Sequence, residues 1–385
     1  MEFDTRLIHG YPVFDEHTGA SSIPKYQAST FMQKDLDEVG EYRYTRFGNP
    51  TITALEKGIA AIENGGKFGF AFASGMAAIS AVLLNFKAGD HLVLCENIYG
   101  GTFQLVTQVM RDFEISATFV DETDPAAWEA AIQPNTRAFY LETPSNPLLS
   151  ITDIKTVAAI AKRHGLATII DNTFMTPDLQ SPLLLGADVV IHSATKFING
   201  HSDVVAGLVI TSDAAWAAKL RQKQAVLGGI LGPEDAWLVM RGMKTLGLRM
   251  KKICTSAQKI AEFLQKSAEV KEVYYPGLPA HPGFAVHQKQ AKSGGAVLSF
   301  RLQDGPAVKE FCRALRLPIL AVSLGGVESI LSFPMTMSHA CVPPKDRLRQ
   351  GVTEDLLRLS VGIEDADDLL SDLSQALKKI GGNNE

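Results

Sequence analysis

Short apolar runs alternate with helical-period stretches along the middle of the chain. Between about residues 66 and 211 each run ends near a polar or glycine-rich turn; the runs are FGFAFA, HLVLC, RAFYLE, LATIID, ADVVIH and AGLVIT. An intervening stretch, DIKTVAAIAKRHG, places apolar residues three and four positions apart and stops at Gly165. Continuous apolar strands separated by helices predict an α/β domain whose mostly parallel sheet is covered on both faces.

The two ends of the chain have different patterns. After about residue 245 a long amphipathic stretch, KKICTSAQKIAEFLQKS, precedes a turn-rich segment and strands such as GAVLSF. The first 60 residues are turn-rich and polar with little periodicity, which is typical of an arm that packs on another subunit. We therefore predict an N-terminal arm over residues 1–60, a large domain over 61–245 and a smaller α+β domain over 246–385.

Composition narrows the classes of partner. The 385 residues are 46% hydrophobic and 21% charged, which suits a globular chain of two domains. With a net charge of -5 and scattered basic residues, the chain has no basic stripe, so no nucleic-acid partner is expected. No apolar stretch approaches the ~18 residues of a membrane span, so we expect a cytoplasmic protein without a membrane partner. The cysteines lack metal-site spacing and are expected to be buried free thiols; they are Cys95, Cys254, Cys312 and Cys341.

The residues that follow the apolar runs are the first candidates for chemistry, because ligands of open α/β sheets gather beyond the carboxyl ends of the strands. The run ADVVIH leads into SATK, which places Lys196 at a strand end beside the hydroxyls of Ser193 and Thr195. A lysine that merely reaches from a strand end into solvent is the alternative. Asp171 ends the run LATIID, where a buried carboxylate needs a cation such as a protonated pyridine nitrogen. Its alternative is an aspartate that caps the next turn.

Two further segments offer contacts for a flat phosphorylated ligand. In ASGMAAI a helix is predicted to begin near Gly75 and Met76, and helix amino termini attract phosphate, although Ser74 could be an ordinary N-cap. In NIYGGT, Tyr99 follows a strand, where its ring could stack on a planar cofactor or belong to the core. Strand-end lysine, strand-end aspartate, helix start and tyrosine together form the set of contacts that pyridoxal 5'-phosphate (PLP) needs.

A series of motifs in fixed order over nearly the whole chain resembles the Cys/Met-metabolism family of PLP-dependent enzymes. The motifs are YTRFGNPT, FASGMAA, YGGT, ETPSNP, DNTF, HSATKF, SLGGVES and RLSVGIED. The resemblance implies the PLP-dependent transferase fold type I, which is aspartate-aminotransferase-like. It also implies a sulfur amino acid as substrate and a homotetramer of two dimers, in which each N-terminal arm reaches the neighbouring active site.

The same resemblance implies roles for individual residues in binding. Tyr44 and Arg46 match residues that contact the cofactor phosphate across the dimer interface, where a guanidinium suits a dianion. Arg358 matches the arginine that binds the substrate α-carboxylate through its planar fork. Asn146 and Ser323 match residues that line this carboxylate and the phenolic oxygen of the cofactor.

Lys196 and Tyr99 are the catalytic residues that the resemblance implies. Lys196 would hold the cofactor covalently until the substrate amine displaces it, and would then remove the α-proton. It is also the natural acid for the departing sulfur, with assistance from Tyr99, because proton transfer requires a group within hydrogen-bond reach.

Two pocket positions bear on which reaction the chain catalyses. By resemblance, many members that act at Cγ carry a glutamate immediately before the serine of SLGG, where this chain has Val322. Members that act on methionine typically carry a cysteine two residues after the stacking tyrosine, where this chain has Gly101. These positions favour β-elimination from L-cystathionine to homocysteine, pyruvate and ammonia. The alternatives are γ-elimination from cystathionine or homocysteine and γ-replacement on an O-acylhomoserine.

Three further possibilities stay open on the sequence. Arg43 could attract the distal carboxylate of cystathionine in a neighbouring subunit, or it could be a solvated surface arginine. A serine hydrolase of Ser74, Asp171 and His192 is disfavoured because FASGM is not a G-x-S-x-G elbow. A non-catalytic scaffold of the same fold would have no reason to retain Lys196, Asp171 and Arg358 together.

Overall fold

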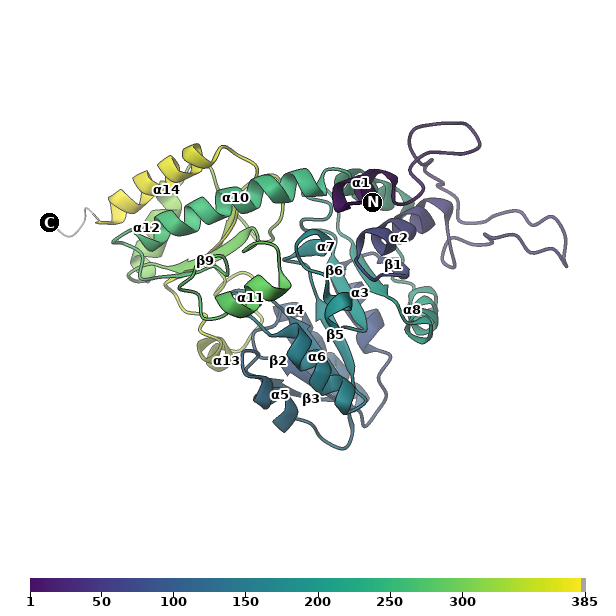
Figure 1. The fold of residues 1–385 in the computed structure, drawn as a ribbon, viewed down its shortest axis with the longest axis horizontal. Helices are drawn as coiled ribbons and strands as arrows, with labels where there is room; N and C mark the ends of the chain where they lie inside the picture. Colours follow the sequence, from purple (N-terminus) through teal and green to yellow (C-terminus); the bar gives the residue numbers. More distant parts are fainter. Residues whose placement is uncertain (382–385) are drawn as a thin grey trace.

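The large domain is built on a seven-stranded sheet of order β1-β7-β6-β5-β4-β2-β3 (Figure 1). The computed structural model describes residues 1–381. Only β7 runs antiparallel to its neighbours, so the predicted α/β domain with a mostly parallel sheet is confirmed. The strands are β1 Phe68–Phe72, β2 His91–Cys95, β3 Ser116–Val120, β4 Thr136–Glu142, β5 Ala167–Asp171, β6 Val189–Ser193 and β7 Gly207–Thr211. The sequence pattern missed β3, an edge strand that is only partly buried.

Successive side chains of the central strands face two different cores. On β7, Val209 belongs to one apolar cluster, whereas Leu208 and Ile210 belong to another on the opposite face. Helices cover both faces, as expected for a parallel sheet. They are α2 Pro50–Ile62, α3 Gly75–Leu83, α4 Gly100–Gln104, α5 Pro125–Ala130, α6 Ile154–Arg163, α7 Thr176–Leu179, α8 Ala214–Leu227 and α9 Pro233–Met243. Shorter turns of helix are the π-helix Leu105–Val109 and the 3₁₀ helices Met110–Phe113 and Pro182–Leu185.

The smaller domain contains a five-stranded sheet of order β10-β11-β12-β9-β8, in which only β10 and β11 pair in parallel. Its strands are β8 Glu272–Tyr274, β9 Val297–Arg301, β10 Ile319–Leu320, β11 Ile330–Ser332 and β12 Leu356–Ser360. The helices that belong to this domain alone are α11 Phe284–Gln290, α12 Gly305–Ala314, α13 Pro344–Arg349 and α14 Ala366–Gly381.

The helix α10, Leu246–Gln265, joins the two domains. Its first half packs into the large-domain core through Met250 and Ile253, and its second half packs into the small-domain core through Ile260 and Leu264. Figure 1 shows α10 running from the neighbourhood of α1, Phe3–His9, toward α12 and α14. The predicted boundary at residues 245 and 246 therefore falls where this shared helix begins.

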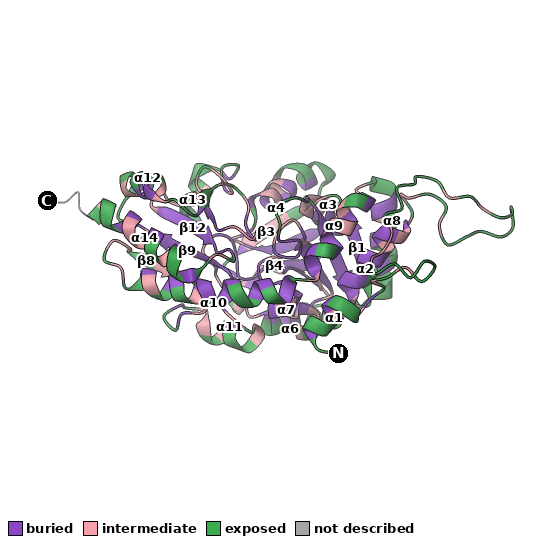
Figure 2. Ribbon diagram, turned by 90° about the horizontal axis from the view of Figure 1, so that it is seen from above, coloured by how far each residue is buried: buried purple, intermediate pink, exposed green. Residues whose placement is uncertain are grey.

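The N-terminal segment, predicted to form an arm over residues 1–60, contains helices as well as loops. Helix α1, Phe3–His9, packs on α2 and α10, and α2 buries Leu55 and Ile59 in the large-domain core. The chain between α1 and α2 instead projects from the body as loops that are largely exposed (Figure 2). The loops carry apolar side chains into solvent, with Met32 94% and Leu36 96% exposed. No helix within residues 1–381 is both long and apolar enough to cross a bilayer.

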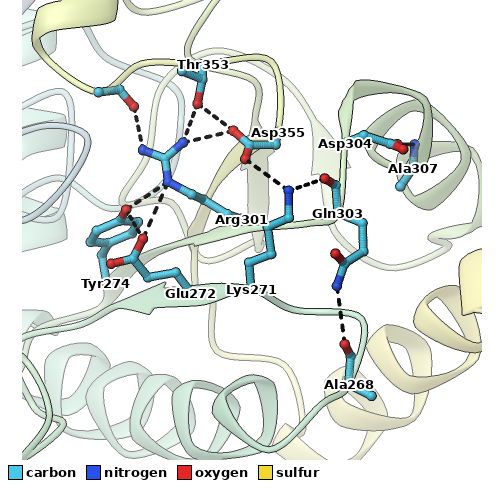
Figure 3. A network of polar contacts seen from close by, with 11 residues as sticks. Ala268, Lys271, Glu272, Tyr274, Arg301, Gln303, Asp304, Ala307, Thr353 and Asp355 are labelled. Atoms are coloured by element: carbon cyan, nitrogen blue, oxygen red, sulfur yellow. Dashed lines mark hydrogen bonds and ion pairs between the residues drawn. The ribbon is translucent and has the colours of Figure 1, made fainter.

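A polar network ties the edge of the small sheet to its loops (Figure 3). At the end of β9, the Arg301 guanidinium donates to Tyr274 Oη (2.8 Å), Asp355 Oδ1 (2.8 Å) and the Gly351 carbonyl (2.6 Å). The charge of Arg301 is thus fully engaged by structural partners.

Candidate active site

A cavity of about 520 Å³ lies at the carboxyl edge of the large sheet, with walls from both domains. The sequence predicted candidates at strand ends because parallel strands bring these ends to one edge. Every predicted site residue except Tyr44 and Arg46 lines this cavity; they are Gly75, Met76, Tyr99, Asn146, Asp171, Ser193, Thr195, Lys196, Ser323 and Arg358.

Lys196 lies three residues beyond the end of β6 and reaches into the cavity. Its Nζ donates a hydrogen bond to Ser323 Oγ at 2.6 Å. Burial lowers the pKa of Lys196 to about 8, and the nearby positive charge of Arg358 acts in the same direction. An amine with such a pKa is partly neutral near neutral pH, so it can act as a nucleophile and as a base.

Asp171 is the last residue of β5 and its side chain is buried. It accepts a hydrogen bond from the Thr173 backbone N–H at 3.0 Å, and no lysine or arginine within residues 1–381 pairs with it. Burial raises the pKa of Asp171 above its usual range. A buried carboxylate without a protein cation fits a ligand that brings its own positive charge.

The start of α3 forms another wall of the cavity. Ser74 is the N-cap, and its Oγ accepts from Ala77 N at 3.0 Å. A Cβ on Gly75 would lie 3.1 Å from Ser193 Oγ, so a larger residue would crowd the hydroxyl at this wall. Thr195 Oγ1, in contrast, is engaged with the backbone of Ala206. The helix start and Ser193 are therefore the best-placed groups for a phosphate.

Arg358 lies in the middle of β12 and is almost fully buried. Its guanidinium donates to Asn146 Oδ1 (3.0 Å), the Ser323 carbonyl (2.7 Å) and Ser332 Oγ (3.0 Å). These acceptors are neutral, and its Nε has no hydrogen-bond partner within the described chain. A buried guanidinium with spare donor capacity suits a carboxylate ligand.

Tyr99 stands at the N-terminus of α4, with its side chain partly exposed to the cavity. Its backbone N–H donates to Glu142 Oε2 at 2.9 Å. A Cβ on Gly101 would lie 2.6 Å from Tyr99 Cε1 and 2.8 Å from Met76 Sδ. Gly101 therefore leaves room for the Tyr99 ring, and any larger residue at position 101 would displace that ring.

Tyr44 and Arg46 lie away from this cavity. Tyr44 forms a bridge with Thr30 in the projecting segment. Arg46 donates to the Ala225 carbonyl at 2.8 Å, and its guanidinium lies 4.5 Å from the centre of the Phe47 ring. Their contact with a neighbouring active site stays a prediction.

Sequence reasoning missed three residues of the site. Glu142 ends β4, so the strand-end rule that identified Asp171 could have found it. Thr173 binds both the Asp171 carboxylate and, through Oγ1, the Ser193 N–H at 2.8 Å. Ser332 accepts a hydrogen bond from Arg358. No sequence pattern could identify Ser332, because its strand β11 is only three residues long.

The prediction that the cysteines are buried is wrong for two of the four. The cysteines are free, but they are not all buried: Cys312 is partly exposed, and Cys341 is exposed and lines the cavity because its loop borders Tyr99.

The hydrolase alternative finds no support in the geometry. Ser74 Oγ caps α3, and His192 Nε2 bonds to Glu63 Oε2 at 2.8 Å.

The residues of the cavity fit PLP. They supply an amine for its aldehyde, an unpaired carboxylate for its ring nitrogen, a helix start for its phosphate and an aromatic ring to stack on it. Arg358 remains available for the carboxylate of an amino-acid substrate.

Comparison with known proteins agrees with this fit. The family model described as Cys/Met metabolism PLP-dependent enzyme matches residues 4–378. The chain is 54% identical over 377 residues to the cystathionine beta-lyase MetC of Bacillus subtilis (strain 168), covering 98% of this chain and 96% of the relative. It is 49% identical to the cystathionine gamma-lyase of the same organism, over 99% of this chain and 100% of the relative. A crystal structure of cystathionine gamma-lyase from Lactobacillus plantarum superimposes with a TM-score of 0.96 at 47% identity, covering 99% and 100% of the two chains.

Proposed function

The chain belongs to the Cys/Met-metabolism family of PLP-dependent enzymes, and on that premise we propose that it cleaves the Cβ–S bond of L-cystathionine. The products are homocysteine, pyruvate and ammonia. The observation that carries the proposal is a single cavity in which Lys196 and Arg358 converge beside an apolar wall at Val322. The 54% identity to a relative named cystathionine beta-lyase supports the same reaction.

The proposal assigns the cofactor contacts as follows. Asp171 pairs with the ring nitrogen, Tyr99 stacks on the ring, and the N-terminus of α3 with Gly75, Met76, Ser193 and Thr195 surrounds the phosphate. When bound, PLP supplies an electron-accepting ring that stabilises negative charge at the substrate α-carbon.

The reaction itself needs proton transfer and a fixed substrate. Arg358 binds the α-carboxylate, and Asn146, Ser323 and Ser332 fix the guanidinium plane for this contact. Lys196 Nζ removes the α-proton and delivers a proton to the departing sulfur, because its lowered pKa lets it carry either state. Ser323 Oγ orients that amine.

The proposal includes an active homo-oligomer. Tyr44 and Arg46 of a neighbouring copy complete the phosphate site, and the exposed apolar side chains of the projecting segment become buried against that copy. A tetramer of two such dimers follows the resemblance drawn from the sequence.

Elimination at Cγ is the second candidate. It is favoured by the 49% identity to a cystathionine gamma-lyase and by a solved gamma-lyase at 47% identity. The apolar Val322 and the bare Gly101 favour the β-reaction, because neither offers a group that could handle a proton beyond Cβ.

Product analysis with purified holoenzyme and L-cystathionine tests the proposal, with Lys196→Ala as the control. Homocysteine and pyruvate, absent with the variant, are expected. Cysteine and 2-oxobutyrate would replace the proposal with the γ-lyase, and no turnover would require O-acylhomoserine or methionine as the next substrates.

A further inference from the structure

Glu142 and Asp171 end neighbouring strands at the same height of the sheet. They are direct partners in the parallel register of β4 and β5, and both line the cavity. Their side chains are buried, with 6% and 8% of each residue exposed. The site therefore presents two carboxyl groups side by side, although PLP offers only one ring nitrogen.

Two buried carboxyl groups in contact with the same cavity do not both ionise without a cation for each. Burial raises the pKa of Glu142 well above its usual range, and the neighbouring Asp171 raises it further, whereas hydrogen bonds from the backbone N–H groups of Tyr99 and Asn146 act in the opposite direction. Charged or titratable groups surround Glu142 from three other strands and two loops; they are Cys95, Asp171 and Arg358 on strands, Tyr99 and Glu122 in loops, with Tyr140 on its own strand. Arg358 is the one permanent cation among them, and its hydrogen bonds within the described residues go to neutral acceptors.

Glu142 is also linked to the cofactor site by a hydrogen bond to the backbone of Tyr99. Its Oε2 accepts from the Tyr99 backbone N–H at 2.9 Å, at the point where the chain turns from β2 into α4. The Tyr99 ring lies against Gly101 and has no side-chain hydrogen bond within the described residues. The position of the ring is therefore set by its backbone, and the Glu142 carboxyl group is the side chain that holds this backbone.

We propose that Glu142 is a positioning residue that keeps its proton in the holoenzyme and holds Tyr99 over the cofactor, while Asp171 carries the negative charge. This division leaves one carboxylate for one ring cation. The inference rests on the PLP dependence of the family and on Tyr99 as the stacking residue, but not on which carbon–sulfur bond is cleaved. A failure of this inference would therefore leave the choice between cleavage at Cβ and at Cγ unaffected, and the reverse also holds.

The charge state is tested with Glu142→Gln, which keeps the shape of the neutral acid and cannot ionise. Glu122→Gln is the matched control, because Glu122 is equally buried and has a raised pKa but does not line the cavity. We expect the pH titration of the cofactor absorption band to have the same midpoint in the wild-type holoenzyme and both variants. A midpoint moved by about one pH unit or more in Glu142→Gln alone would show that Glu142 is ionised and would overturn the proposal.

An infrared difference spectrum gives a second readout that does not depend on turnover. The holoenzyme should show a protonated carboxyl band that disappears in Glu142→Gln and persists in Glu122→Gln. If no band is lost on substitution of Glu142, the residue is a carboxylate and the inference is wrong.

The positioning role is tested by a double-mutant cycle on PLP affinity, measured by cofactor fluorescence. Glu142→Ala should weaken PLP binding about tenfold when Tyr99 is present, because the backbone N–H loses its buried acceptor. In a Tyr99→Ala background the same change should have little effect. Equal weakening in both backgrounds would mean that Glu142 acts on the cofactor site without Tyr99, which contradicts the role proposed.

Discussion

Lys196 Nζ donates a 2.6 Å hydrogen bond to Ser323 Oγ, which joins the lysine of the large domain to a loop of the small domain. Ser323 adopts φ +85°, a left-handed conformation that is unfavourable for a residue with a side chain. The same residue accepts from Arg358 through its carbonyl at 2.7 Å. One strained residue thus orients both the amine and the guanidinium on which the proposed reaction depends.

Ser323→Ala should lower kcat more than it changes KM. The substitution removes the acceptor that orients Lys196 but leaves the carbonyl that holds Arg358. A lost hydrogen bond to a charged group corresponds to about 1.5 kcal/mol, or about tenfold in kcat. Steady-state kinetics check this, with Ser332→Ala as the control: Ser332 contacts Arg358, so its loss should raise KM instead. Equal effects on kcat in both variants would contradict these separate roles.

Arg358→Lys should raise KM for the amino-acid substrate by about 10- to 100-fold, because an ammonium group cannot reproduce the planar fork. Arg301→Lys is the matched control, since Arg301 is also a β-strand arginine with several acceptors (Figure 3), but it does not line the cavity. It should lower the melting temperature without changing KM. An unchanged KM for Arg358→Lys would remove this residue from the substrate site.

The strand-end rule accounts for most of the site that could be predicted. Lys196, Asp171 and Tyr99 all lie at or just beyond the carboxyl ends of buried strands, and parallel topology alone brings them to one edge. Glu142 occupies the equivalent place on β4 and was missed because a glutamate has no obvious role among the contacts of a planar cofactor. A polar residue at the carboxyl end of any buried strand is therefore a candidate site residue, whatever its type.

Other features depend on tertiary pairing that no local pattern encodes. Ser332 meets Arg358 only because β11 pairs with β12 in one register. Helix α2 begins at Pro50, within a stretch whose sequence shows little periodicity, and its buried apolar residues begin only at Ile52. The positions of Tyr44 and Arg46 relative to a neighbouring site depend on a second copy of the chain.

The stability of the protein should fall as the pH falls from about 6.5 to about 4, in part through His339. Burial lowers the pKa of His339 to about 4, and the charge of Arg358 contributes. In the unfolded chain the histidine has a pKa near 6.5, so within this window the unfolded state binds a proton that the folded state does not. The free energy of unfolding therefore decreases toward acid, by at most about 1.4 kcal/mol per pH unit from this residue.

Denaturant unfolding at fixed protein and PLP concentrations measures this slope. His339→Gln should flatten the dependence between pH 6.5 and 4, whereas substitution of the exposed His17 by Gln should leave it unchanged. An identical slope in wild type and His339→Gln would show that other groups account for the acid sensitivity.

Arg43→Ala should raise KM for L-cystathionine and leave KM for a substrate without a distal carboxylate unchanged. Arg43 is exposed in the projecting segment beside Tyr44, where a neighbouring subunit could present it to the far end of the substrate. An exposed charge pair is worth up to about 1 kcal/mol, which corresponds to a rise of about fivefold. Lys34→Ala, an exposed cation of the same segment, is the control. If KM for cystathionine is the same in Arg43→Ala and the wild type, Arg43 is a surface residue.

Val322→Glu should move the product ratio from pyruvate toward 2-oxobutyrate. Val322 lines the cavity with 64% of its surface exposed, next to the serine that orients Lys196, so a carboxylate there could reach protons beyond Cβ. Val205→Glu is the matched control, because Val205 also lines the cavity and is 60% exposed. Both variants add the same charge to the same cavity, so a change seen only at position 322 reflects position and not net charge. Quantifying both keto acids from L-cystathionine checks this. An unchanged ratio with retained turnover would mean that regiochemistry is set elsewhere, and the apolar wall would no longer argue for cleavage at Cβ.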